Sequence, residues 1–290
     1  MEGVRYEAPE TLQAAVALLA GATGDARILA GGTDVIVQME TDLIEPTLLV
    51  DIKKIKEMRQ IASENGGFRV GAAVPGMAII NHAALCQAWP GVVDGVKLIG
   101  SIQIKGRASI GGNLCNASPA ADSVPPLIAA GAIARIIGPN GVREVPVETI
   151  PVGPGKTSLA KGEIVVSFFL PPRPAHSSDA YQRFTPRTEM DIAVVGVGIS
   201  LTLDDGGTCT AARVALGAVA PTVLLVKDAA DALIGTRLDE AALDRLAKAA
   251  SAACRPIDDK RGTKEFRIKI AGVLAKRTAQ QALERARQSR

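Results

Sequence analysis

Two glycine pairs about 80 residues apart constrain this 290-residue chain more than any other feature. One pair lies in residues 30–34 (AGGTD) and the other in residues 109–113 (SIGGN), and each follows an apolar run. Glycine has no Cβ and tolerates positive φ, so each pair can bring bare backbone amides against an anion. One such pair alone is usually an ordinary tight turn. Two of them in one chain make a candidate cradle for a pyrophosphate.

The two best-known phosphate-binding patterns are missing from the sequence. No Gly-x-Gly-x-x-Gly follows a predicted strand with an acidic residue about 20 positions further on. No Gly-x-x-x-x-Gly-Lys-Ser/Thr is present either. The sequence therefore argues against both a Rossmann-type dinucleotide site and a P-loop.

Further motifs surround the two glycine pairs. Residues 99–105 (IGSIQIK) precede the second pair and residues 116–122 (NASPAAD) follow it; residues 187–193 (RTEMDIA) and 264–277 (KEFRIKIAGVLAKR) come later. Together with AGGTD and SIGGN, these motifs resemble those of the FAD-binding medium subunits of molybdenum hydroxylases, of the xanthine dehydrogenase and carbon monoxide dehydrogenase type. The resemblance extends over almost the whole chain.

This resemblance implies an α+β fold in two domains. A two-part FAD-binding domain of the PCMH type is expected over residues 1–172, and a smaller α+β domain, a three-stranded sheet with C-terminal helices, over residues 179–290. The length agrees, because 290 residues exceed the usual ~100 to 200 per domain. Residues 171–178 carry three prolines and two serines, which predicts a linker there.

Periodicity and turn residues predict a mixture of helices and strands. Hairpins should turn at residues 65–67 (NGG) and 139–141 (PNG), and the C-terminal sheet should turn at residues 204–207 (DDGG). The expected helices cover residues 9–19, 77–88, 92–100, 122–130, 240–254 and 264–287. The expected strands and hairpins cover residues 28–30, 47–52, 60–71, 132–147, 162–170, 181–184, 192–203 and 209–219.

The resemblance also implies that the chain binds FAD. The backbone amides of residues 31–33 and of residues 111 and 112 would share the diphosphate, neutralising it with main-chain dipoles. Thr33, Ser109 and Asn113 would offer hydroxyl or amide groups to phosphate and ribityl oxygens, or would only stabilise turns. The residues expected at FAD are Leu29, Ala30, Gly31, Gly32, Thr33, Asp34, Val35, Ile99, Gly100, Ala108, Ser109, Gly111, Gly112, Asn113, Asp122, Val165, Arg183 and Ile192.

Three charged residues of this set have a second interpretation. Asp34 is unfavourable beside a diphosphate unless it faces away, and it could instead cap the helix that follows. Asp122 could bind ribityl hydroxyls or cap the helix expected over residues 122–130. Arg183 could lie near the isoalloxazine and favour the reduced flavin anion. It could equally be a surface charge or pair with Glu189 or Asp191.

The sequence offers no catalytic or metal-binding constellation. The four cysteines are scattered without a Cys-x-x-Cys, and the two histidines lack partners, so no catalytic residue and no metal site is expected in this chain. By resemblance, a large molybdopterin subunit hydroxylates the substrate and a small subunit relays electrons through [2Fe-2S] clusters. The FAD of this chain would pass them to NAD or another acceptor, within a dimer of heterotrimers.

Other functions stay open at this point. A stand-alone FAD-dependent oxidoreductase of the same binding fold would need a proton donor over the flavin, and residues 181–290 hold no histidine and one tyrosine. A scaffold whose glycine loops are mere turns is another alternative. Within the favoured class, quinone, ferredoxin or oxygen could replace NAD. The substrate is not readable, because by resemblance it binds the molybdenum subunit.

Composition and charge narrow the partners and the location. Only 3% of the residues are aromatic, which argues against a nucleic-acid stacking surface, and the apolar runs are far shorter than the ~18 residues of a membrane span. The four scattered cysteines predict reduced thiols, so a cytoplasmic location is expected. The net charge of +3 is uneven, since residues 255–290 hold eleven Lys and Arg against four Asp and Glu. A solvated helix face or a protein-interface stripe would explain this segment.

Overall fold

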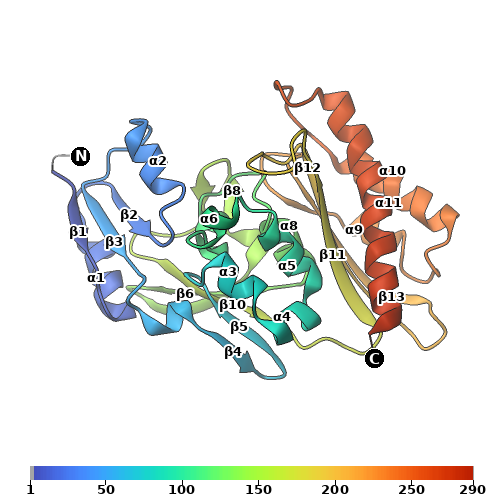
Figure 1. The fold of residues 1–290 in the computed structure, drawn as a ribbon, viewed down its shortest axis with the longest axis horizontal. Helices are drawn as coiled ribbons and strands as arrows, with labels where there is room; N and C mark the ends of the chain where they lie inside the picture. The colour runs from blue at the N-terminus through green and yellow to red at the C-terminus, as the bar shows by residue number, and fades with distance from the viewer. Residues whose placement is uncertain (1–2, 290) are drawn as a thin grey trace.

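The computed structural model describes residues 3–289, which form two layered parts side by side (Figure 1). The first part begins with a parallel three-stranded sheet in the order β1-β3-β2. Parallel neighbours need crossover connections, and here two helices lie on them. These elements are β1 (Arg5–Glu7), α1 (Leu12–Gly21), β2 (Ala26–Leu29), α2 (Val35–Glu40) and β3 (Leu48–Asp51).

An antiparallel five-stranded sheet in the order β4-β5-β10-β6-β7 completes the first part. Its central strand reads IVVSFFL and is almost wholly buried, as expected for a strand covered on both faces. The strands are β4 (Ile61–Glu64), β5 (Gly67–Gly71), β6 (Ile133–Gly138), β7 (Gly141–Pro146) and β10 (Ile164–Leu170). The small hairpin β8 (Pro151–Gly153) and β9 (Lys156–Thr157) and the 3-10 turns η1 (Lys56–Arg59) and η2 (Val147–Thr149) lie beside them.

Six short helices fill the middle of the molecule, between this sheet and the C-terminal part (Figure 1). They are α3 (Gly76–Ile80), α4 (Ala83–Ala88), α5 (Pro90–Lys97), α6 (Ile102–Lys105), α7 (Ile110–Cys115) and α8 (Val124–Ala129). Helices α5 and α8 pack on the C-terminal sheet.

The C-terminal part is an antiparallel sheet in the order β11-β12-β13-β14, and α11 packs on β11, β12 and the neighbouring α10. Three strands are predicted from the sequence; the fourth, β14, has only two residues and carries no periodicity to detect. The elements are β11 (Ser177–Phe184), β12 (Val195–Leu203), β13 (Cys209–Gly217), β14 (Leu224–Leu225), α9 (Lys227–Asp231), α10 (Glu240–Ala253) and α11 (Lys264–Gln288).

Each part has its own hydrophobic core, and buried ion pairs join the parts. Arg173 donates to Asp179 Oδ1 at 2.7 Å and lies 4.2 Å from the ring of Trp89. The other oxygen of Asp179 accepts from the backbone of Val92 in α5, at 3.0 Å. We call the side chains of Arg173, Asp179 and Trp89 the junction cluster. It fixes β11 against α5.

One local prediction needs correction, and the helix that follows Ser109 was not predicted. The helix expected over residues 77–88 is two helices, because the side chain of His82 accepts from Leu85 N at 3.1 Å and begins α4 afresh. The second glycine pair opens a helix: Ser109 is the N-cap of α7. The predicted α+β class and both hairpin turns are confirmed.

Among residues 3–289, no helix combines the length and the apolar character that a membrane span requires.

Candidate cofactor site

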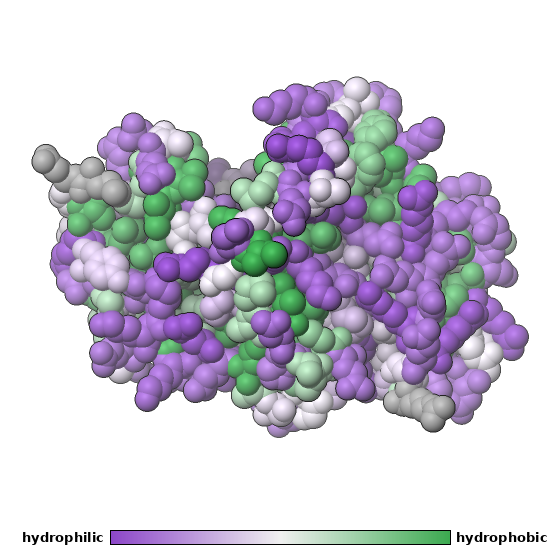
Figure 2. Space-filling view, in the orientation of Figure 1, coloured by the Kyte–Doolittle hydropathy of each residue, from purple (hydrophilic) through white to green (hydrophobic). Residues whose placement is uncertain are grey.

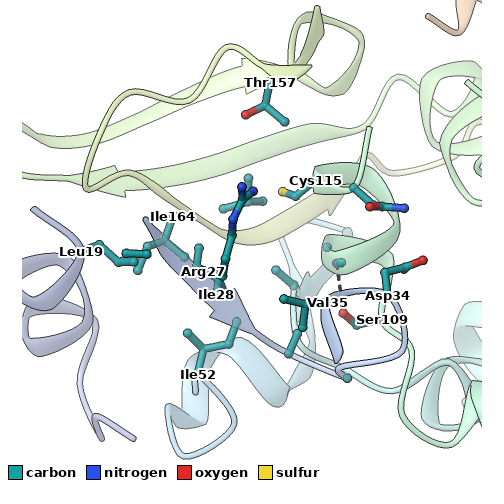
Figure 3. A pocket seen from close by; sticks show the side chains of 18 of the residues that line it. Leu19, Arg27, Ile28, Asp34, Val35, Ile52, Ser109, Cys115, Thr157 and Ile164 are labelled. Atoms are coloured by element: carbon teal, nitrogen blue, oxygen red, sulfur yellow. Dashed lines mark hydrogen bonds between the residues drawn. The ribbon is translucent and has the colours of Figure 1, made fainter. Parts of the chain in front are cut away.

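A cleft of about 490 Å³ lies between the first glycine loop and the five-stranded sheet (Figure 3). Strand β2 and α2 form one wall, α7 and β10 the other, and Thr157 of the small hairpin faces Ile28 across the opening (Figure 3). Of the residues predicted at FAD, those that line the cleft are Ala30, Gly31, Gly32, Thr33, Asp34, Val35, Ile99, Ala108, Ser109, Gly111, Gly112, Asn113 and Val165. Those that do not line it are Leu29, Gly100, Asp122, Arg183 and Ile192.

The first glycine loop presents a row of free donors to the cleft. The backbone amides of Gly31, Gly32, Thr33 and Asp34 find no acceptor among the described residues. Gly32 has φ +80°, a conformation that places successive amides on one side of the chain. Helix α2 starts directly after this row, so its dipole adds positive potential at the same place. The loop therefore has the free donors and the backbone shape that an anion site requires.

The two glycine loops touch each other. A Cβ built on Gly31 would lie 2.1 Å from the carbonyl oxygen of Arg107, immediately before the second loop. A Cβ on Gly111 would lie 2.5 Å from the carbonyl oxygen of Ala72. Both approaches are closer than any side chain allows, so glycine at these positions sets the width of the cleft.

The amides of the second loop, predicted to share the diphosphate, have hydrogen-bond partners within the chain in this structure. Gly111 N donates to Ala72 O at 3.1 Å, and Gly112 N donates to Ser109 Oγ at 3.1 Å, the bond drawn in Figure 3. Both donors are thus used within the chain. What this loop offers instead is Asn113, whose Oδ1 accepts from Ser123 N at 3.1 Å and Ser123 Oγ at 2.7 Å. Its amide Nδ2 has no partner among the described residues and lies on the cleft wall.

Asp34 does not form the helix cap that was one of its two predicted roles. It occupies the N-cap position of α2 but makes no capping hydrogen bond, because its backbone has helical angles. Desolvation beside the cleft raises the pKa of its carboxyl above the ordinary value. Removal from water disfavours the charged form of a carboxyl, and this is why the pKa of Asp34 rises.

Several cleft residues escaped sequence reasoning. Arg27 extends into the cleft and pairs with Asp25 at 2.9 Å, while Lys161 lines it without an ion pair to any described residue. Alternation along β2 does not mark Arg27, because its neighbours Ala26 and Ile28 line the cleft as well. Cys115 also lines the cleft, and burial raises the pKa of its thiol to about 12, so it stays protonated. No group of three metal-ligating side chains occurs within residues 3–289.

Asp122 and Arg183 meet behind the cleft. Asp122 accepts from Arg183 Nη1 at 2.5 Å and from the hydroxyl of Tyr181 at 2.8 Å, and all three side chains are buried. The predicted helix cap by Asp122 is wrong, since Ser123 holds that position and no side chain caps α8. Arg183 pairs with neither acidic group proposed for it; it reaches the backbone carbonyl of Asp191 at 3.3 Å. Burial raises the pKa of Asp122 to about 6, against the opposing charge of Arg183.

Comparison with known proteins places this fold and cleft in a class. A family model described as the FAD binding domain in molybdopterin dehydrogenase matches residues 2–173. A second, described as the CO dehydrogenase flavoprotein C-terminal domain, matches residues 179–282. The chain belongs to this family of FAD-binding subunits of molybdopterin-dependent oxidoreductases, and the resemblance found in the sequence is confirmed.

Particular relatives match over nearly their whole length. The chain is 34% identical to the carbon monoxide dehydrogenase medium chain of Afipia carboxidovorans, over 97% of each chain. It is 32% identical to the xanthine dehydrogenase FAD-binding subunit of Escherichia coli O157:H7, over 96% of this chain and 95% of that one. The crystal structure of the cyanide-inactivated Cu,Mo-CO dehydrogenase superposes with a TM-score of 0.93 at 34% identity, covering 97% of this chain and 98% of that chain.

Proposed function

We propose that this chain holds one FAD in the cleft and serves as the electron-transfer subunit of a molybdopterin-dependent hydroxylase or dehydrogenase. The observation that carries the proposal is the row of four free amides in residues 31–34, which opens onto a cleft bounded by the second glycine loop. The diphosphate is the part of FAD that such a row binds. Its oxygens accept hydrogen bonds from several amides that point to one place.

The other residues of the cleft match the chemistry of the remaining parts of FAD. The amide Nδ2 of Asn113 and the hydroxyl of Thr33 would donate to phosphate or ribityl oxygens. Ile99 and Val165 would cover the ring system with apolar surface, and Arg27 supplies a cation at the other end. Direct contacts of FAD with Leu29, Gly100, Asp122, Arg183 and Ile192 stay predictions.

Membership of the family supports a proposed electron route. Bound FAD supplies the ability to accept electrons singly and release them in pairs. We infer that a [2Fe-2S] subunit delivers the electrons, that a molybdopterin subunit oxidises the substrate, and that NAD or another acceptor takes them up. A dimer of heterotrimers is the proposed assembly. Two relatives, a carbon monoxide dehydrogenase medium chain and a xanthine dehydrogenase FAD-binding subunit, support this division of labour.

Flavin analysis and turnover assays test the proposal. The purified chain should release about one equivalent of FAD on acid denaturation, and NADH or dithionite should bleach its visible bands. FMN in place of FAD, or a flavin that stays attached after denaturation, would contradict the diphosphate assignment. Substrate-dependent turnover by the chain alone, with molybdenum and iron shown to be absent, would instead identify a stand-alone flavoenzyme.

A further inference from the structure

Helix α2 is a wall of the cleft that few contacts hold in place. Of its six residues only Met39 is buried. Val37 is 53% exposed, and Leu43 in the turn that follows is 72% exposed. Figure 1 shows α2 projecting at the upper left of the molecule, and Figure 2 shows apolar and polar groups mixed on this projection. A helix this short is not stable by itself in water, so the few contacts that α2 makes determine its position.

One hydrogen bond ties α2 to the opposite wall of the cleft. Gln38 Nε2 donates to Asn116 Oδ1 at 3.1 Å, and both side chains line the cleft. Within residues 3–289, no other hydrogen bond or ion pair joins residues 35–40 to anything outside residues 32–44. Both partners are half-buried, so the bond is partly shielded from water. We call this hydrogen bond the clasp.

The spacing along both helices places the clasp next to the glycine loops. Gln38 comes four residues after Asp34, and Asn116 comes four residues after Gly112. Residues four apart share one face of a helix, and one turn rises about 5.4 Å. The two walls of the cleft therefore meet at two levels, at the contact between the glycine loops and again one helical turn further on, at the clasp.

The two sides of the clasp differ in how firmly they are held. Helix α7 packs on β10 and α8, and its side chains of Ile110 and Leu114 are almost wholly buried. The residue after Asn116, Ala117, accepts from Gly155 N in the turn of the small hairpin at 3.1 Å. Helix α2 has no such support. When the walls separate, α2 is therefore the side that moves.

A movement of α2 would reach the free amides directly. Ile36 N donates to Gly32 O at 3.1 Å, and Gln38 N donates to Asp34 O at 2.9 Å. The first turn of α2 is thus continuous with the row of free donors in residues 31–34. An outward movement of the helix would carry these donors away from the second glycine loop, and a ligand held between the two loops would be released.

We propose that the clasp makes α2 a gate: Gln38 holds the helix closed on the cleft, and breaking its bond to Asn116 lets FAD enter and leave. The identity of the ligand rests on the proposed function. The clasp itself needs no ligand, because both partners belong to the chain, so it favours the closed state of the free and the loaded protein alike. Its loss should speed entry and release by the same factor and leave the dissociation constant almost unchanged.

Stopped-flow flavin fluorescence tests this signature. Gln38→Leu keeps a side chain of similar size and removes the donor. We expect both association and release of FAD to become about threefold to tenfold faster, which is the factor that one neutral hydrogen bond allows. The dissociation constant should stay within about twofold of the wild-type value. Gln13→Leu is the matched control, because Gln13 is exposed on α1, and its rates should equal those of the wild type.

A swap of side-chain lengths tests the bond itself. Gln38→Asn shortens one partner by a methylene group and should accelerate both rates as Gln38→Leu does. Adding Asn116→Gln to that variant lengthens the other partner by the same amount and should restore the slow rates. A double variant as fast as Gln38→Asn alone would overturn the clasp.

Hydrogen exchange of the chain stripped of FAD gives a readout that does not depend on the ligand. The backbone amides of residues 36–41 should exchange faster in Gln38→Leu than in the wild type or in Gln13→Leu. Unchanged exchange or unchanged rates in Gln38→Leu would overturn the clasp. Faster release with unchanged association would also overturn it, because Gln38 would then be a ligand of FAD. A wild-type chain that binds no FAD would overturn the proposed function, and the exchange data would still judge the clasp.

Discussion

The guanidinium of Arg183 donates to the carboxylate of Asp122 at 2.5 Å, and the two residues belong to different parts of the fold. Asp122 precedes α8 in the first part, and Arg183 lies on β11 in the second. The next residue, Ser123, donates to Asn113 on the cleft wall. The C-terminal sheet thereby supports the wall of a cleft whose own residues come from the first part.

The close contact of the two glycine loops predicts the effect of a single methyl group. Gly31→Ala would place Cβ 2.1 Å from Arg107 O, so the loops must separate. We expect a loss of about 1–3 kcal/mol of unfolding free energy and reduced FAD occupancy. Denaturant unfolding and flavin absorbance measure both. Gly153→Ala, where a Cβ meets nothing within 4 Å, should change neither; equal effects at both positions would contradict the account.

Two substitutions at Asn113 should separate an effect on FAD binding from an effect on the stability of the chain. Asn113→Asp keeps the acceptor for Ser123 but loses the amide donor and adds a negative charge at the cleft. FAD affinity should fall by about tenfold or more, with little change in thermal stability of the cofactor-free chain. Asn113→Ala should lower both the FAD affinity and the thermal stability of the cofactor-free chain, because Ser123 then loses its acceptor. Retained affinity in the Asp variant, measured by fluorescence titration, would show that this amide does not contact the cofactor.

Asp122 predicts how stability depends on pH. Its pKa in the folded chain is about 6, above the ordinary 3.8, so the folded state binds the proton more tightly than the unfolded state. The contribution of protonated Asp122 to the free energy of unfolding is therefore fully present below pH ~4. It is lost as the pH rises through 6. The unfolding free energy of the wild type, relative to Asp122→Asn, should fall by up to about 3 kcal/mol between pH 4 and 7.

Tyr181→Phe sharpens this test. The hydroxyl of Tyr181 donates to Asp122 and lowers its pKa, so removing it should move the transition to higher pH. Denaturant unfolding across the pH range, at equal cofactor content, follows the shift. A difference curve flat between pH 4 and 7 would show that Asp122 does not titrate there.

The junction cluster predicts a large loss on removing one charge. Arg173→Met retains packing on Trp89 but leaves the buried carboxylate of Asp179 without its cation. We expect a loss of roughly 3–5 kcal/mol. Trp89 is the single tryptophan of the chain, so its fluorescence reports unfolding at the junction itself. Lys227→Met breaks an exposed pair with Asp231 and should leave the transition nearly unchanged.

The sequence predicted the features that depend on residues close together in the chain. The turns NGG and PNG determine their hairpins because glycine there relieves a strained conformation, as at Gly66 and Gly141. The division of the helix at His82 was missed, since a histidine ring accepting a capping bond leaves no pattern. Motif resemblance predicted the first glycine loop as an anion site, and its amides are indeed free.

Contacts between distant residues could not be predicted in the same way. Asp122 and Arg183 are 61 positions apart, and each has an ordinary local explanation, a helix cap and a surface charge. Arg27 and Lys161 come together at the cleft only because β2 faces the segment before β10. The hydrogen bond from Gly111 N to Ala72 O depends on the packing of α7 on the sheet. Such partners follow from tertiary structure, which one sequence does not specify residue by residue.

In the proposed binding mode, the free amides of residues 31–34 would link cofactor binding to the stability of the whole chain. Donors without an acceptor in the protein bond to water until a ligand replaces it, and only the folded chain holds four of them together for that ligand. By mass action, a hundredfold excess of ligand over its dissociation constant adds about 2.7 kcal/mol to the unfolding free energy. The melting temperature of this protein should therefore depend on flavin supply, and in a cell short of FAD the chain would be the more readily degraded.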